Sequence, residues 1–147
     1  MKFAFLLFAL TGCADSEKST AEDHDHDHDH GHGDESLPED FDPSTELVTE
    51  SGVTVSYTTS PDPIPESELF EVIISASSGT VMDADASMPT HGGHGMTVDP
   101  VLTDNEDGTV TAAPFEFHMP GYWLIQVTVA DEEGNEEQVR FDVDCCE

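Results

Sequence analysis

The chain has 147 residues, of which 33 are Asp or Glu and only 3 are Lys or Arg, so its formal net charge is -30 at pH 7. Such a charge repels phosphate groups, which excludes nucleic acids and anionic lipid surfaces as partners, and it attracts cations. A strongly solvated surface has the same composition, so cation binding and simple solubility remain two interpretations of the charge.

The first residues predict export and lipid anchoring. Residues 3–10 are apolar and follow Lys2, as in a secretory signal peptide, and they are far fewer than the roughly 20 residues of a membrane-spanning helix. The run ends in Leu-Thr-Gly-Cys13, which resembles a lipobox and implies cleavage before Cys13 and acylation of that residue. We therefore expect a signal peptide over residues 1–12 and a lipid-anchored protein of the cell envelope. In a Gram-negative host, Ala14 favours the outer membrane, facing the periplasm.

Residues 13–45 predict a disordered tether between this anchor and a folded domain. The segment is rich in acids and contains almost no large apolar side chains, so it lacks the apolar surface needed to offset the entropy of ordering a chain. A tether of this kind is at least a spacer.

Five histidines alternate with other residues, mostly aspartates, inside the predicted tether. Imidazole is a common ligand of Zn, Cu and Ni, and a neighbouring carboxylate can orient it. A flexible tail of this composition predicts weak, unselective capture of divalent metals, and the alternative is a stalk whose histidines bind nothing. The candidate ligands are His24, His26, His28, His30 and His32.

From residue 46 onward, short runs rich in β-branched and aromatic residues alternate with turn sequences. This pattern predicts an all-β immunoglobulin-like sandwich of about seven strands over residues 46–147, with Trp123 near the centre of its core and no helix. The predicted strands are residues 47–57, 69–76, 80–85, 97–103, 109–117, 122–130 and 137–144. In the last two strands, alternation directs an apolar face into the core: Trp123, Ile125, Val127 and Val129 in the first, and Val139, Phe141 and Val143 in the second.

A glycine-rich loop between two predicted strands carries two histidines and two methionines. Thioethers suit Cu(I) and imidazole serves both copper states, so the mixture favours copper over zinc. The candidate ligands are Met88, His91, His94 and Met96, although either methionine also fits a role as core filler at a strand end.

The sequence Phe115-Glu116-Phe117-His118-Met119 lies later in the chain. Strand alternation puts Phe115, Phe117 and Met119 on one face, so we expect Met119 in the core and His118 exposed. His118 is a further candidate ligand because the glycine-rich loop can lie beside it in a sandwich.

Read together, Met-Pro-Thr-His-Gly-Gly-His-Gly-Met and the later Phe-His-Met-Pro-Gly-Tyr-Trp make residues 69–143 similar to the YtkA-like and FixH-like family of small envelope domains. The resemblance implies an immunoglobulin-like sandwich, membrane anchoring and an association with copper handling or cytochrome oxidase assembly. This chain has one additional glycine between the two loop histidines. The matching positions are Met88, Pro89, His91, Gly92, His94, Gly95, Phe117, Met119, Pro120, Gly121 and Trp123.

The three cysteines leave an adjacent pair, Cys145 and Cys146, once Cys13 is acylated. In an oxidising compartment these two residues can form a vicinal disulfide, link two copies of the chain, or offer thiolates to a metal. Two inert residues near the chain end are the simplest interpretation.

These patterns predict a lipoprotein that binds a transition metal, copper first and zinc second, through its tail and its Met/His loop, for buffering or delivery. The alternative is an interaction module that docks onto a membrane protein complex, with the tail only a stalk. We do not expect an enzyme, because no nucleophile has an evident base and no catalytic motif is present.

Overall fold

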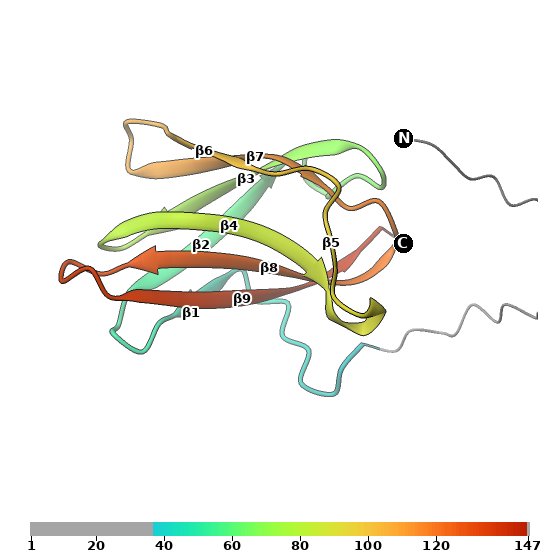
Figure 1. The fold of residues 1–147 in the computed structure, drawn as a ribbon, viewed down its shortest axis with the longest axis horizontal. Helices are drawn as coiled ribbons and strands as arrows, with labels where there is room; N and C mark the ends of the chain where they lie inside the picture. Colours follow the sequence, from blue (N-terminus) through green and yellow to red (C-terminus); the bar gives the residue numbers. More distant parts are fainter. Residues whose placement is uncertain (1–36, 147) are drawn as a thin grey trace, which may run out of the picture. The chain divides into compact units, whose positions relative to one another are not determined.

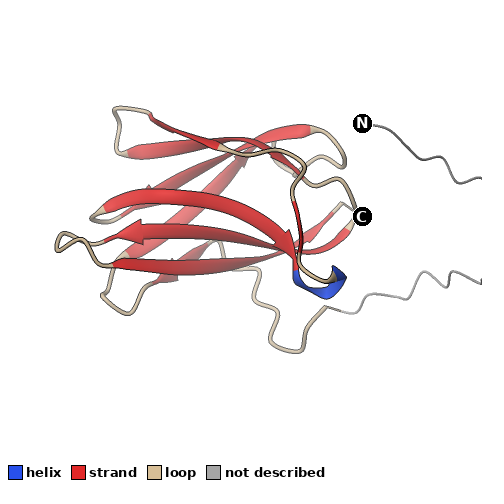
Figure 2. Cartoon of the chain, viewed as in Figure 1, coloured by secondary structure: helices blue, strands red, loops and turns tan. Residues whose placement is uncertain are grey.

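The computed structural model describes residues 37–146, which consist mainly of β-strands (Figure 1). The one helical turn in this part of the chain is a short 3-10 helix, η1 (Figure 2). The elements in chain order are β1 (Glu46–Val48), β2 (Thr54–Ser60), β3 (Leu69–Ala76), β4 (Thr80–Met88), η1 (Pro89–His91), β5 (His94–Gly95), β6 (Val101–Asp104), β7 (Thr109–Glu116), β8 (Gly121–Ala130) and β9 (Glu136–Cys145).

The strands form two antiparallel sheets. One sheet has five strands in the order β1-β2-β3-β7-β6, and the other has four in the order β5-β4-β8-β9. Apolar side chains from both sheets fill one continuous core. For example, the rings of Tyr57 on β2 and Phe141 on β9 meet edge to face, with centroids 4.9 Å apart. The predicted all-β sandwich is therefore confirmed.

Strand alternation determines which side chains enter the core. On β8, Trp123, Ile125, Val127 and Val129 are all buried, and the residues between them are half-buried. Successive side chains of a strand point to opposite faces, so an apolar residue at every second position supplies one buried face. The inward face predicted for this strand is confirmed, and Trp123 is fully buried.

The predicted strand over residues 47–57 is wrong, because this segment is a hairpin made of β1 and β2. The chain reverses at Gly52, whose φ of 92° lies in the left-handed region that glycine adopts readily. Thr49 closes the turn: its backbone N–H donates to the Val53 carbonyl at 2.9 Å, and its hydroxyl oxygen accepts from the Val53 N–H at 3.0 Å. The turn was not predicted because β-branched residues lie on both sides of it.

The predicted strand over residues 97–103 is also partly wrong, since pairing begins only at Val101. Pro100 has no N–H to donate to a sheet, and the Thr97 hydroxyl donates to the Glu116 carboxylate at the end of β7. Residues 97–100 are therefore a connection between the two sheets. The preceding strand β4, by contrast, continues three residues past its predicted end at Asp85 to Met88.

The last residues of the predicted tether contact the sandwich. The backbone N–H of Asp42 donates to the Asp142 carboxylate at 2.8 Å, and the Phe41 ring lies edge to face with Tyr122 at 6.1 Å. Ordered contacts thus begin before residue 46, because Phe41 supplies an apolar group that can pack. The predicted signal peptide and the acylation site Cys13 lie outside the described residues.

Truncation of a core ring should destabilise the sandwich far more than truncation of a surface side chain. Phe141→Ala removes a side chain that is 0% exposed, so we expect a loss of about 3–5 kcal/mol in the free energy of unfolding. Val101→Ala is the control, because Val101 is 67% exposed and its truncation should change stability by less than about 0.5 kcal/mol. Denaturant unfolding followed by Trp123 fluorescence measures both, and equal losses would contradict the two-sheet core.

The turn after β8 predicts a pH-dependent contribution to stability. Hydrogen bonds from the Asn135 side chain and backbone, and from the Glu133 backbone, hold the pKa of Asp131 below its usual value. A carboxyl whose pKa is lower in the folded state stabilises the fold above its unfolded pKa, and this stabilisation disappears as the pH falls through the folded pKa. Asp131→Asn should therefore lower stability at neutral pH, and the difference from wild type should shrink in acid.

The control for this change is Glu132→Gln, which removes a neighbouring charge without touching the Asp131 hydrogen bonds. Its difference from wild type should not follow the Asp131 titration. Unfolding measured at a series of pH values tests both variants, and a pH-independent effect of Asp131→Asn would disprove the explanation.

Candidate functional site

One end of the sandwich collects the histidines and most of the sulfur atoms of the described residues. Strands β4 and β9 end there, at Met88 and Cys145, and β8 begins there, with Gly121 paired to Cys145. Figure 1 shows η1, β5 and the C-terminal end of β9 at this same end. We call it the histidine end and define it by His91, His94, His118, Met88, Met96 and Met119.

The glycine-rich loop at this end is shaped by a tight reversal after β4. Pro89 begins η1, and Gly92 ends it with a φ of 68°, in the left-handed region. The backbone N–H of Gly93 then donates to the Met88 carbonyl at 3.1 Å, and the chain returns as β5, where His94 pairs with Met88. The loop therefore returns its second histidine to the edge of the four-stranded sheet.

The four loop candidates differ in accessibility. Met88 is 0% exposed and belongs to the hydrophobic core, so the core-filler interpretation holds for this residue. Met96 is half-buried and packs against the same core. His91 is half-buried and His94 is exposed, so both imidazoles lie at or near the surface.

His118 is not exposed, so its predicted position is wrong. It is half-buried, and its Nδ1 atom is buried without a hydrogen-bond partner. Its ring lies edge to face with the Trp123 indole, with centroids 5.5 Å apart. The alternation rule failed because β7 ends at Glu116, and residues after it no longer follow a strand.

The connection that carries His118 is fixed from both sides. The Phe117 ring stacks on Trp123 at 4.4 Å, and the Trp123 indole N–H donates to the Met119 carbonyl at 3.0 Å. The Ser67 backbone N–H donates to the Phe117 carbonyl at 2.9 Å, and the Ser67 hydroxyl donates to the His118 carbonyl at 3.3 Å. These contacts hold the His118 backbone in place.

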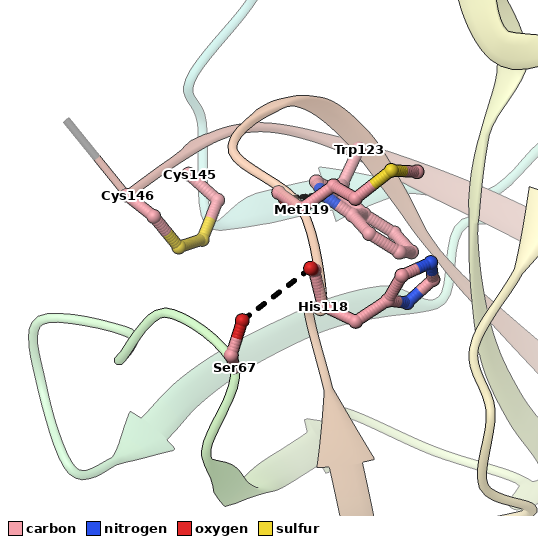
Figure 3. The surroundings of a disulfide bond; sticks show 6 residues. All are labelled: Ser67, His118, Met119, Trp123, Cys145 and Cys146. Carbon is pink, nitrogen blue, oxygen red and sulfur yellow. Dashed lines mark hydrogen bonds between the residues drawn. A yellow bond between two sulfur atoms is a disulfide. The ribbon is translucent and has the colours of Figure 1, made fainter.

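Met119 packs against the core, as predicted, but remains half-buried. Figure 3 shows its thioether and the His118 imidazole extending in the same direction, alongside the Trp123 indole. Met119 was not among the predicted ligands, because strand alternation assigned it to the core alone.

The glycine-rich loop and the His118 connection belong to neighbouring segments. The hydrogen bond from Thr97 to Glu116 joins the residue after Met96 to the end of β7, two residues before His118. Helix η1 also contacts β8, the strand that carries Trp123. The fold therefore brings imidazole and thioether groups from separate parts of the chain to one region.

Two further observations concern possible metal ligands and cationic side chains in residues 37–146. Residues 37–146 contain no group of three or more His, Cys, Asp or Glu side chains that could hold a metal ion. Arg140 is the sole Lys or Arg in that range, and it lies on β9 with its Nε donating to Gln138 at 3.0 Å. Within residues 37–146, a cation approaching the histidine end therefore meets no lysine.

The predicted tail ligands His24, His26, His28, His30 and His32 lie outside the described residues. Within the part of the chain that the structure covers, no helix is both long and apolar enough to cross a bilayer.

Comparison of the chain with protein-family models, with curated proteins and with solved structures found no match. The resemblance to YtkA-like and FixH-like domains therefore stays a prediction that rests on the residues of the glycine-rich loop and of the segment from Phe117 to Trp123.

Proposed function

We propose that this chain is a lipid-anchored envelope protein that binds a transition metal, copper in preference to zinc, and buffers or delivers it without catalysing a reaction. The observation that carries the proposal is the buried Nδ1 atom of His118, which has no hydrogen-bond partner. This atom belongs to the histidine end, where the other described histidines and the thioethers of Met96 and Met119 also lie. The signal peptide and acylated Cys13 supply the anchoring part of the proposal.

The donor chemistry fits copper. A buried polar atom without a partner costs roughly 1–3 kcal/mol, and a metal bound to that atom would remove the cost. Thioether sulfur is a soft ligand that suits Cu(I), and imidazole binds both Cu(I) and Cu(II). His118 and Met96 would hold the ion, with His91 and His94 as further imidazole donors nearer the solvent.

The differing exposure of the donors suggests an order of events. His94 is exposed and His91 is half-buried, so these residues can accept an ion from solution or from the histidine tail. His118 lies deeper, against Trp123, and would retain the ion in a drier environment. The net charge of -30 would raise the local concentration of cations around all of these groups.

A copper titration tests the domain site directly. The titrated variant is the full chain with serine in place of the five tail histidines and of Cys13, so that the remaining imidazole ligands belong to the domain. Trp123, the sole tryptophan, reports binding by its fluorescence. His118→Ala should weaken Cu(I) binding at least about tenfold, which corresponds to about 1.4 kcal/mol. The double change His91→Ala with His94→Ala should weaken it as well, and Zn(II) should bind less tightly than Cu(I).

The matched control for the titration is Met82→Leu, because Met82 is a methionine on β4 that is 49% exposed and lies outside the histidine end. Its Cu(I) affinity should equal that of the unchanged chain. If His118→Ala and the double histidine variant both bind Cu(I) as well as the control does, the domain holds no copper site.

A second experiment separates metal capture from the alternative of an interaction module with a stalk. Replacing residues 24–32 by a Ser/Asp linker of equal length preserves the reach of the tail and removes its imidazoles. If the tail binds metal, the linker variant should bind fewer Cu(II) and Zn(II) ions per chain than wild type at pH 7.5. The two chains should differ little at pH 5, where imidazole is protonated. A stalk predicts equal metal content for both chains at both pH values.

A further inference from the structure

A separate pocket of about 430 Å³ opens beside the C-terminal end of β9. In Figure 3 the Cys145–Cys146 disulfide and the His118 imidazole lie on opposite sides of the connection that carries His118 and Met119. The pocket is therefore distinct from the proposed copper site. Its lining includes Tyr57 on β2, Asp62 and Ile64 in the loop that follows, and Asp144, Cys145 and Cys146.

Both cysteines contribute to the wall of this pocket. They are joined to each other by a disulfide, and they differ in accessibility: Cys145 is 2% exposed, whereas Cys146 is half-buried. The two residues are adjacent in sequence, and both line the same pocket. Reduction would therefore leave two thiols on neighbouring residues of one pocket wall.

The charges around the pocket favour a cation. The carboxylates of Asp62 and Asp144 line it, and no Lys or Arg does. Burial, together with the negative charge of Asp62, raises the pKa of the Tyr57 phenol, as expected for a partly desolvated group beside an acid. Anionic ligands would meet repulsion here.

We propose that reduced Cys145 and Cys146 form a second binding site, for a soft monovalent cation such as Cu(I). Thiolate sulfur is the softest ligand that a protein offers, and two thiolates on adjacent residues can bind one such ion. The site uses none of the residues of the histidine end, so it does not depend on the copper site proposed above. The disulfide form has no thiolate, and oxidation would therefore abolish binding.

The chemistry balances with a small dithiol as the reductant. One thiolate of the dithiol attacks the accessible sulfur of Cys146, which breaks the Cys145–Cys146 bond and forms a mixed disulfide. The second thiol of the reductant then displaces Cys146 and leaves as a cyclic disulfide, so two electrons and two protons pass to the protein. Binding of Cu(I) by both sulfur atoms afterwards releases two protons.

The test uses the full chain with Cys13→Ser, which leaves only the C-terminal cysteine pair. The protein is treated with a dithiol under nitrogen, freed of it by gel filtration and titrated with Cu(I) held by a coloured chelator. We expect one more Cu(I) per chain after reduction than before it, and none of this gain if the thiols are alkylated first. Alkylation avoids substitution of the buried Cys145, which risks unfolding.

Variants then locate the additional ion. Asp62→Asn, which alters the pocket, should weaken the binding of this ion severalfold, whereas Asp104→Asn, at the exposed end of β6, should not. His118→Ala should leave the gain on reduction unchanged. The proposal is overturned if reduction adds no ion, if alkylated protein still gains one, or if the gain disappears in His118→Ala.

Discussion

The stack of Phe117 on Trp123 is the contact on which the proposed chemistry depends. The two rings lie nearly parallel, at 8° and 4.4 Å, and both side chains are fully buried. Trp123 also donates its indole N–H to the Met119 carbonyl, so one residue of β8 fixes the connection on both sides of His118. Aromatic stacking of this kind contributes about 0.5–1.5 kcal/mol beyond the burial of the rings. The imidazole is thus positioned by the core and not by hydrogen bonds of its own ring.

The fold distributes the carboxylates and the candidate metal ligands differently over the surface. Carboxylates cover much of the surface, whereas the imidazole and thioether groups of the described residues gather at one end, apart from exposed Met82 on β4. A cation would be attracted over the whole surface and would find most of the imidazole and thioether donors of residues 37–146 at that end. The acidic surface and the local donors therefore have complementary effects, the first on encounter and the second on retention.

The sequence predicted the all-β sandwich, the strand β3, and the buried faces of β8 and β9, because an apolar residue at every second position leaves few other structures. It failed at Gly52, where a turn lies between two β-branched runs, and at His118, where alternation was applied beyond the end of β7 at Glu116. The pocket beside the cysteine pair was not predictable, because it is formed by β2, the following loop and β9, which only tertiary pairing brings together.

The central claim is that the buried Nδ1 of His118 is a metal ligand. Nitrogen NMR of the imidazoles, recorded as one equivalent of Cu(I) is added to the chain without tail histidines, measures this directly. The account predicts a large shift of the His118 Nδ1 resonance that is complete at one equivalent. An unchanged His118 resonance, with shifts confined to His91 and His94 or absent altogether, would contradict it.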